Sequence, residues 1–371
     1  MEVPLSRPDI TGKEKDSVLE VLSSPYLSMG PKVGEFEQLI ADFTGRKYAV
    51  AVSSGTAALH LIIKALGIGK GDEVITTPFS FIASANCLLY EGAVPVFADI
   101  EPRTLNLDMN KVEAKITPRT RAILPVHVFG QPGNMSTLKT LAASHSLPVV
   151  EDSCEALGAV YKGTPAGGWG VAAAFAFYPN KQITTGEGGV VVTDSPEINR
   201  LCRSMRNQGR GEQNLWLQHP RLGYNYRMDE LSAALGCAQM GRVREILVRR
   251  QEVADRYKRL LSGIRGVILP YVEPGVEMSW FVYVIRMEQG VNRDKVMDYL
   301  TDHGVQCRPY FTPIHLQDFY REQLGYREGD FPITEGVSKS TLALPFFNNI
   351  TEGEMEYVAA TLAKAVRQFG G

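Results

Sequence analysis

Helical and extended segments alternate along the chain from about residue 35 to 205, and this alternation limits the possible folds most strongly. The run TAALHLIIKAL at 56–66 has apolar residues at helical spacing, and EVIT at 73–76 follows a Gly-Lys-Gly-Asp turn as a short strand. The other elements expected here are a helix at 80–90 and strands at 93–97, 122–128 and 149–151. Such repeated units favour a mainly parallel sheet covered by helices on both faces, so the predicted fold class is α/β.

The second part of the chain has a different pattern. A long helix-compatible run from Met228 to about Leu261 is interrupted by Gly236 and Gly241, and it could connect two domains. The elements expected after it are a β-rich stretch at 281–285 and helices at 293–303 and 353–368. We therefore predict a large domain over residues 1–245, including an N-terminal segment, and a smaller α+β domain over residues 246–371.

Composition excludes several classes of function. The formal net charge is -2, and acidic residues match the scattered Lys and Arg residues, so no nucleic-acid-binding surface is indicated. No apolar run approaches the roughly 18 residues that a membrane span needs, and the first residues lack the apolar core of a signal peptide. The five cysteines are far apart and form no CxxC motif, which is typical of reduced thiols rather than of disulfides or a zinc site. We expect a cytoplasmic protein without a bound metal.

A first candidate site lies where the predicted strand 48–52 meets the helix at 56–66. Ser53, Ser54, Gly55 and Thr56 occupy this junction. A helix N-terminus presents free N–H groups and a partial positive charge, and glycine allows close approach of the backbone, so the junction suits a phosphate group. An ordinary helix cap would carry the same residue types.

A second candidate is the acidic pair Glu151-Asp152, which directly follows the apolar run Leu147-Pro148-Val149-Val150. Functional groups of α/β sheets collect at the carboxyl ends of strands. A carboxylate there could keep the nitrogen of a pyridine ring protonated, which makes the ring an electron sink. An acid that caps the next helix or faces solvent would have the same position in the sequence.

The third candidate is Lys181, which follows the aromatic run FAFYPN at 175–180 and precedes the glycine-rich TTGEGG at 184–189. A lysine in such a place can point into a cleft and form an imine with an aldehyde cofactor. Most lysines, however, lie on the surface without a special role. The combination of the three motifs in this order is much more specific than any one of them.

With these motifs the chain resembles the DegT/DnrJ/EryC1 family of sugar aminotransferases. These are pyridoxal-phosphate (PLP) enzymes with the aspartate-aminotransferase fold, fold type I. Matching segments run through most of the chain and match best before residue 245. They are SSGTAALHL (53–61), GIGKGDEVITTPFSF (67–81), GAVPVFADI (92–100), PVHVFGQPGNM (125–135), VVEDSCEALGA (149–159), FAFYPNKQITTGEGG (175–189) and LGYNYRMDELSAALG (222–236).

The resemblance implies roles for the residues that would hold PLP. Lys181 matches the lysine that forms the imine with the cofactor, and Asp152 matches the acid paired with the pyridinium nitrogen. Gly55 and Thr56 match the residues that seat the phosphate. Phe81 matches an aromatic side chain that stacks on the cofactor ring, although simple core packing would also account for a phenylalanine here.

The resemblance also implies a homodimer with shared active sites. Asn225 matches an asparagine that reaches the cofactor phosphate of the neighbouring subunit, although an asparagine there could equally cap a helix or hold a turn. Arg227 and His315 fall in segments that line the substrate pocket in relatives. Core packing is an equally good explanation for His315.

Two positions depart from the family pattern. Ala176 stands where relatives often carry a serine that helps to bind the phosphate, so one hydrogen-bond donor is missing. Glu155 stands near the expected ring hydroxyl of the cofactor, where relatives usually carry glutamine. A glutamate occurs there in some perosamine-type relatives, which favours a 4-keto sugar as substrate.

The resemblance thus implies transfer of an amino group from L-glutamate to a nucleotide-linked keto sugar, for surface polysaccharides or antibiotic sugars. Two alternatives stay open. One is a PLP-dependent sugar dehydratase of the same family, although those relatives carry histidine in place of the lysine found here as Lys181. The other is a PLP-binding regulatory protein without catalytic activity.

Overall fold

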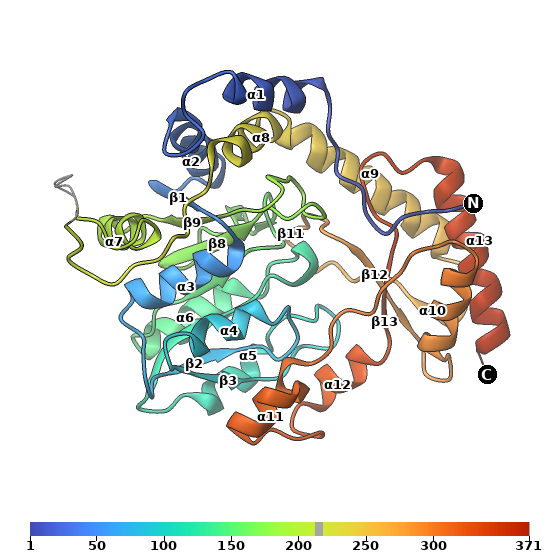
Figure 1. Cartoon of the computed structure of the whole chain (residues 1–371). Coiled ribbons are helices and arrows are strands. Elements are labelled where there is room, and N and C mark those ends of the chain that lie inside the picture. The colour runs from blue at the N-terminus through green and yellow to red at the C-terminus, as the bar shows by residue number, and fades with distance from the viewer. Residues whose placement is uncertain (212–217, 371) are drawn as a thin grey trace.

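The computed structural model describes residues 1–211 and 218–370, which form a large α/β domain and a smaller α+β domain (Figure 1). The helices are α1 (Gly12–Leu22), α2 (Pro31–Thr44), α3 (Gly55–Ala65), α4 (Ala83–Leu89), α5 (Met109–Val112), α6 (Met135–Ser144), α7 (Pro196–Arg206), α8 (Glu230–Met240), α9 (Val243–Leu261), α10 (Arg293–Asp302), α11 (Asp318–Leu324), α12 (Pro332–Ser338) and α13 (Glu352–Phe369), with 3-10 turns at Glu113–Lys115, Val128–Gly130 and Ile314–Leu316. The strands are β1 (Tyr48–Val52), β2 (Glu73–Thr76), β3 (Val94–Phe97), β4 (Thr120–Leu124), β5 (Val150–Asp152), β6 (Val160–Tyr161), β7 (Thr164–Pro165), β8 (Ala172–Ala176), β9 (Gly189–Thr193), β10 (Val267–Ile268), β11 (Val276–Glu277), β12 (Tyr283–Met287) and β13 (Thr341–Leu344).

The large domain is built on two groups of strands that meet edge to edge. One group has the order β3-β2-β4 and the other the order β5-β8-β9-β1. Isolated parallel bridges, Ile123 to Val149 and Val126 to Asp152, join β4 to β5. All pairs are parallel except those of β9, which is antiparallel to both β1 and β8. The predicted α/β fold class with a mainly parallel sheet is therefore confirmed.

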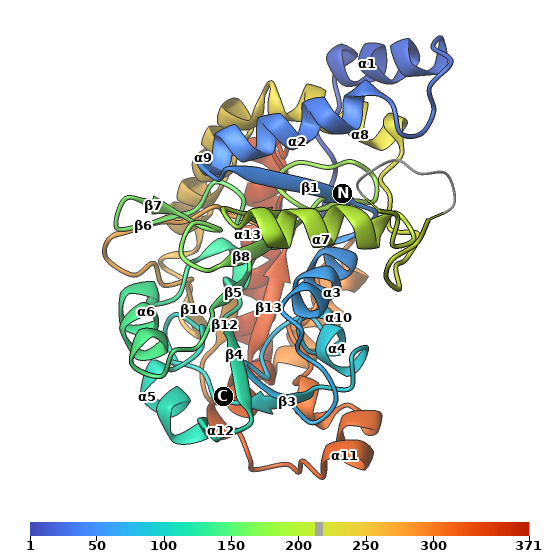
Figure 2. The ribbon, with the colours of Figure 1, turned by 90° about the vertical axis from the view of Figure 1, so that its left-hand side faces the viewer.

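Helices cover both faces of this sheet, as Figure 2 shows, with α5 and α6 on one side and α3 and α4 on the other. Burial on both faces explains the sequence of the central strands. Every residue of β9 is buried, and β8 is buried over its first four residues, so neither strand alternates between apolar and polar residues. Functional groups are expected where the parallel strands end.

The small domain contains the antiparallel sheet β10-β12-β13, against which α10 and α13 pack. The N-terminal segment belongs with this domain in space. Val3 is buried in the small-domain core, and its backbone N–H donates to the Gly304 carbonyl at 2.8 Å. Figure 1 accordingly shows the N-terminus beside α13, far from the large sheet.

The two domains share α9, which contains the predicted border between residues 245 and 246. Val243 and Ile246, in its first turns, pack in the large-domain core. Tyr257 and Leu261, in its last turns, pack in the small-domain core. One helix therefore contributes side chains to the cores of both domains. Within the described residues, no helix is both long enough and apolar enough to cross a membrane.

Candidate active site

A cavity of about 520 Å³ lies at the carboxyl edge of the parallel strands, where the loops after β1, β2, β5 and β8 converge. Phe281, Tyr310 and Phe311 close it from the side of the small domain. The structure brings six of the residues singled out in the sequence to this one cavity. They are Gly55, Thr56, Phe81, Asp152, Glu155 and Lys181.

The first turn of α3 forms one end of the cavity. Ser54 caps the helix, and its hydroxyl oxygen accepts a hydrogen bond from the Ala57 N–H at 3.1 Å. A Cβ atom added at Gly55 would lie 2.6 Å from Ala176 Cβ and 2.9 Å from Cys154 Sγ, so only glycine lets the helix start this close to β8. The positive end of an eleven-residue helix therefore faces the cavity.

The two neighbouring acids at the end of β5 point in different directions and have different tasks. Glu151 is fully buried, and its carboxylate accepts hydrogen bonds from His127 Nε2 and from the backbone N–H groups of Gly167, Trp169 and Gly170 at 2.7–2.9 Å. Burial raises the pKa of Glu151, but these donors outweigh it and hold that pKa below its usual value. Glu151 thus fixes the 167–170 loop, while Asp152 lines the cavity.

Asp152 is 5% exposed, and both of its carboxylate oxygens accept a hydrogen bond. Oδ2 accepts from the Ser84 hydroxyl at 2.6 Å, and Oδ1 accepts from the Cys154 N–H at 3.1 Å. The donors come from α4 and from the loop after β5, on two sides of the carboxylate. The acid is therefore held in one orientation at the cavity wall.

Lys181 lies beside Glu155 and above an aromatic ring. Its Nζ is 3.7 Å from Glu155 Oε1 and 3.8 Å from the centre of the Phe281 ring. The Phe129 N–H donates to Glu155 Oε2 at 2.8 Å. Burial raises the pKa of Glu155, and the positive charge of Lys181 opposes this rise. The lysine amine thus lies at the cavity with the Glu155 carboxylate within 4 Å.

Phe81 projects into the cavity from the loop after β2 and is 63% exposed. The side chain lines the cavity and is not packed in a hydrophobic core. The exposure excludes the core-packing explanation for Phe81 and leaves its ring available for stacking.

Asn225 and Arg227 do not reach the cavity of their own chain. Tyr224 and Tyr226 stack with ring centres 4.9 Å apart and are bound to Glu91 and His60 through their hydroxyls, while Asn225 between them is exposed. Arg227 donates to Asn207 Oδ1 at 2.9 Å. It lines a separate cavity of about 260 Å³.

The expectation that His315 lines the substrate pocket is not supported by its position. The side chain is fully buried, its Nε2 lies 3.0 Å from Glu335 Oε1, and its ring packs against Phe331. Burial lowers the pKa of this histidine. His315 therefore packs against Phe331 and Tyr326, two residues of the cluster that joins α11 to the large domain, which fits the core-packing explanation.

Several cavity residues were not singled out in the sequence. Ser84 touches Asp152, and Phe281, Tyr310 and Phe311 arrive from distant segments. The aromatic residues carry no local signal, because they reach the cavity only by packing against the large-domain core from segments distant in the sequence. Ser80 and Ser84, four residues apart in an apolar predicted helix, were a signal that could have been recognised.

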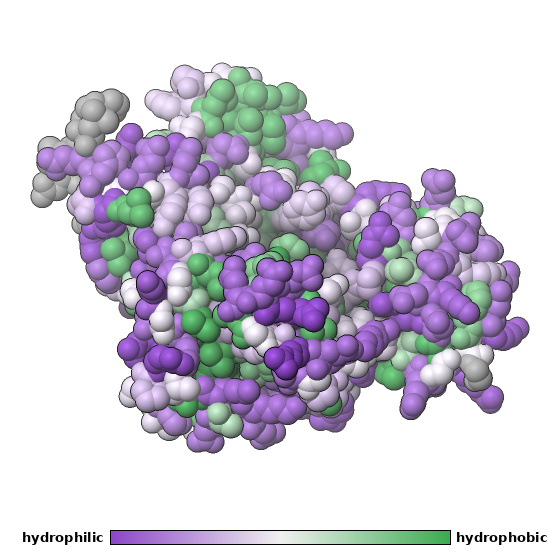
Figure 3. Space-filling view, turned by 60° about the horizontal axis from the view of Figure 1, so that its bottom comes forward, coloured by the Kyte–Doolittle hydropathy of each residue, from purple (hydrophilic) through white to green (hydrophobic). Residues whose placement is uncertain are grey.

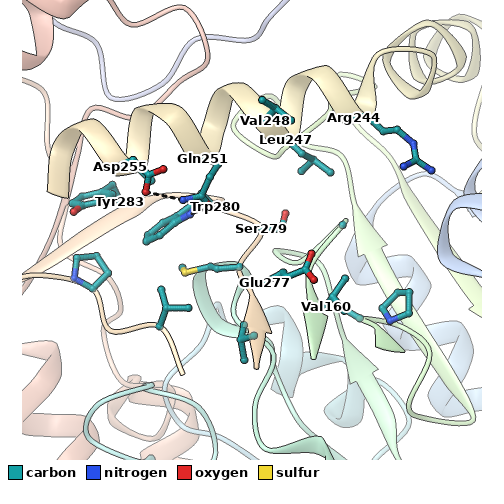
Figure 4. Close-up of a pocket in the computed structure, with 18 of the residues that line it drawn as sticks. Val160, Arg244, Leu247, Val248, Gln251, Asp255, Glu277, Ser279, Trp280 and Tyr283 are labelled. Atoms are coloured by element: carbon teal, nitrogen blue, oxygen red, sulfur yellow. Dashed lines mark hydrogen bonds between the residues drawn. The ribbon is translucent and has the colours of Figure 1, made fainter. Parts of the chain in front are cut away.

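A larger cavity, of about 1190 Å³, lies beneath α9 on another side of the Ser279–Trp280 segment (Figure 4). Gln251 and Asp255 of α9 line it, and Gln251 Nε2 donates to Asp255 Oδ1 at 2.9 Å. Trp280 and Tyr283 form another part of its wall. None of the residues predicted for chemistry lines it. The smaller cavity with Lys181 is therefore the candidate active site.

Comparison with known proteins identifies the family of the chain. The sequence model of the DegT/DnrJ/EryC1/StrS aminotransferase family matches residues 8–363. The chain is 40% identical to the GDP-perosamine synthase of Caulobacter vibrioides, with 97% of each chain covered, and 38% identical to the spore coat polysaccharide biosynthesis protein SpsC of Bacillus subtilis, with 98% of this chain and 97% of that protein covered. Among solved structures, the PLP form of the putative sugar aminotransferase Spr1654 from Streptococcus pneumoniae superimposes with a TM-score of 0.95 at 26% identity over the whole of both chains.

Proposed function

Because the chain belongs to the DegT/DnrJ/EryC1/StrS aminotransferase family, we propose that it is a PLP-dependent enzyme that moves an amino group from L-glutamate to a nucleotide-linked keto sugar. The observation that carries this proposal is the convergence of Lys181, Asp152 and the first turn of α3 on one cavity. These residues offer an amine, a carboxylate and an anion seat, which are the three groups that such a cofactor requires.

The residues of the cavity fit PLP. Gly55 permits the close approach of α3 to β8, and Thr56 adds a hydroxyl at the same end. The carboxylate of Asp152 can pair with the ring nitrogen of PLP, and the exposed ring of Phe81 can stack on the cofactor ring. When bound, PLP supplies a protonated ring that withdraws electrons from the carbon next to the reacting nitrogen.

Lys181 would act first as the anchor of the cofactor and then as general acid and base. Its Nζ supplies the nucleophile for attachment, and the released amine accepts and returns one proton at that same atom. The amine must be uncharged to do so. Before it loses its proton, the charged amine stabilises the carboxylate of the buried Glu155, whose Oε1 lies 3.7 Å from Nζ.

The residues of both departures from the family pattern line the cavity. At Ala176 the missing hydroxyl is replaced by a methyl group that lies against the position of Gly55, so the α3 end must supply the phosphate donors. Glu155 takes the place of the usual glutamine near the expected ring hydroxyl. We propose a 4-keto sugar as acceptor, because Glu155 and the similarity to a GDP-perosamine synthase favour the same substrate class.

We test the acceptor by a half-reaction. The enzyme is first converted to its aminated form with L-glutamate, and nucleotide-linked keto sugars are then added one at a time. We expect a 4-keto sugar to restore the starting absorbance spectrum, whereas common α-keto acids other than 2-oxoglutarate do not. Rapid exchange between two ordinary amino acids, with no response to any keto sugar, would contradict the proposal. A regulatory protein without catalysis would show no spectral change with glutamate.

A dehydratase of the same family is the less favoured alternative. Lys181 keeps an amine at the position where those relatives carry histidine, and its Nζ lies inside the cavity. We therefore keep the aminotransferase as the proposed function.

We also propose a cytoplasmic location, which agrees with the five free cysteines, none of which forms a disulfide.

We further propose that the active unit is a homodimer with two shared sites. Apolar residues gather on α1 and on the loop that leads to α2, where Figure 3 shows a green patch at the top of the view. Leu19, Leu22, Tyr26, Leu27 and Met29 are each more than half exposed there. A second copy of the chain would cover them, since patches of this kind mark protein interfaces. The exposed Asn225 could then donate its amide hydrogens to the phosphate in the neighbouring site.

Mixing of two inactive variants tests the shared site. We expect Lys181→Ala and Asn225→Asp each to be inactive alone, because the first lacks the amine and the second repels the phosphate. In a mixed dimer one site carries both lesions and the other carries neither, so up to about half of the wild-type activity per mixed dimer should return. No recovery after proven subunit exchange, or a fully active monomer in sedimentation, would contradict the shared site. Asn225→Ala serves as the control. If Asn225 only holds a turn or caps a helix, this substitution should lower the stability by about 1 kcal/mol and leave the cofactor affinity unchanged.

A further inference from the structure

The carboxylate of Asp152 lies at the end of a chain of two buried hydroxyls. Ser84 Oγ donates to Asp152 Oδ2 at 2.6 Å, and Ser80 Oγ lies 2.7 Å from Ser84 Oγ. A hydroxyl has only one hydrogen, and Ser84 gives its hydrogen to the carboxylate. Ser80 is therefore the donor to Ser84, and both hydrogens point toward Asp152.

The burial of these hydroxyls shows that they need this arrangement. Ser80 is 4% exposed and Ser84 is 1% exposed, and both line the cavity. A buried hydroxyl without a partner would cost free energy, whereas a hydrogen bond to a charged oxygen is among the stronger ones in proteins. Hydrogen bonds in a chain also strengthen one another. The two hydroxyls therefore stabilise the Asp152 carboxylate by hydrogen bonding and do not only fill space in the core.

The second oxygen of Asp152 is held independently, by the Cys154 N–H. A carboxylate with donors on both oxygens cannot rotate about its Cβ–Cγ bond without losing one of them. Because the donors belong to α4 and to the loop after β5, the plane of the carboxylate is set by two separate elements. That plane decides where a ring nitrogen would meet the acid.

We infer that Ser84, supported by Ser80, is a positioning residue that holds the Asp152 carboxylate in the orientation required by the cofactor's ring nitrogen. The inference rests on the proposed function, because the ring nitrogen belongs to PLP. Ser84 acts only through Asp152. Removal of the hydroxyl lets the carboxylate turn, so the ring nitrogen is held less firmly and carries less positive charge.

The chain offers a closely matched control for this inference. Ser153 is also fully buried and is adjacent to Asp152 in the sequence, but its hydroxyl oxygen has no hydrogen-bond partner among the described residues. The substitutions Ser84→Ala and Ser153→Ala remove the same atom at similar burial. Only the first removes a contact with the carboxylate.

We expect Ser84→Ala to weaken cofactor binding to the apoprotein about tenfold, measured by absorbance or fluorescence titration with PLP. The pH midpoint of the bound cofactor's visible absorbance should also move to higher pH, because a less positive ring withdraws fewer electrons. Ser80→Ala should show a smaller change in the same direction, Ser84→Thr should keep most of the affinity, and Ser153→Ala should change neither quantity. Should Ser84→Ala fail to fold, Ser80→Ala carries the same test.

A double-substitution cycle decides whether Ser84 acts through Asp152. In an Asp152→Asn background, Ser84→Ala should cause little further loss of cofactor affinity, because the carboxylate that it orients is gone. A full tenfold loss in that background, or a Ser84→Ala protein that behaves like Ser153→Ala, would overturn the inference. If the wild type itself binds no PLP, the proposed function fails. If it binds PLP and Ser84→Ala has no effect, only the positioning role fails.

Discussion

Replacement of Lys181 by arginine is expected to abolish turnover while the fold survives. Arginine keeps the positive charge beside Glu155 and above the Phe281 ring, so the electrostatic surroundings change little. Its guanidinium stays protonated and cannot attach the cofactor or move a proton as an amine does. Both tasks of the lysine are lost together, so the rate should fall by more than about ten-thousandfold.

The measurement has two parts. Steady-state assays with L-glutamate and the responding keto sugar give the rate, and thermal unfolding shows whether the fold is intact. Reduction of the wild type with borohydride, followed by peptide mapping, should find the cofactor on the peptide that contains Lys181. Lys139→Arg, at an exposed position on α6, is the matched control and should keep full activity. Attachment of the cofactor to another lysine would contradict the assignment.

The sequence alone predicted several elements of the large domain and the order of its motifs. The predicted strands at 48–52 and 73–76 have the same bounds in the structure, and the predicted helix at 56–66 is shifted by one residue as α3 (Gly55–Ala65). The antiparallel direction of β9 was not predictable, because a strand buried on both faces has no alternation that reveals its neighbours. The predicted strand at 122–128 is β4 (Thr120–Leu124) in the structure, and it ends directly before Pro125, which has no backbone N–H to donate to a neighbouring strand.

The sequence predicted those residues of the candidate site that lie at the end of a strand or shortly after it. Asp152 is the last residue of β5, and Gly55 and Lys181 follow β1 and β8. These parallel strands end at one edge of the sheet, so the convergence of the three residues is a consequence of the fold. Three features depend on long-range packing instead. Val3 joins the small domain, Phe281 closes the cavity, and His315 turns into the core rather than toward the cavity.

At the residues of the proposed shared site, the exposure of Asn225 is the feature of a single chain that indicates an active site assembled from two copies. Within one chain this residue lies outside the cavity, and only its anchored neighbours Tyr224 and Tyr226 show that the exposed position is held firmly. An exposed polar side chain on a firmly held backbone can serve at an interface. The shared site therefore stays a proposal that the mixing experiment tests.

Replacement of Asp152 by asparagine is expected to lower the rate about a thousandfold and to weaken retention of the cofactor. The change preserves the size of the side chain but removes its charge, so the ring nitrogen loses the anion that keeps it protonated and the ring becomes a poorer electron sink. A thousandfold loss corresponds to about 4 kcal/mol in the activation free energy.

The hydrogen bonds around Asp152 add a second cost. Both carboxylate oxygens accept a hydrogen bond in the structure, from Ser84 and from the Cys154 N–H. An asparagine presents one acceptor and one NH2 group, so one of these donors must lose its partner or turn away. We therefore expect a modest loss of stability, which thermal unfolding of the apoprotein measures separately from catalysis.

The outcome that would contradict this assignment is near-wild-type turnover in Asp152→Asn. The other acids that line the cavity are Glu155 and Glu187, so one of them would then have to serve the ring nitrogen. Glu155→Gln distinguishes these possibilities, because glutamine is the usual family residue there and should leave the rate within about tenfold of the wild type if Asp152 is the ring partner. A collapse of activity in Glu155→Gln together with an active Asp152→Asn would move the role to Glu155, whose carboxylate is already fixed by the Phe129 N–H and lies beside Lys181.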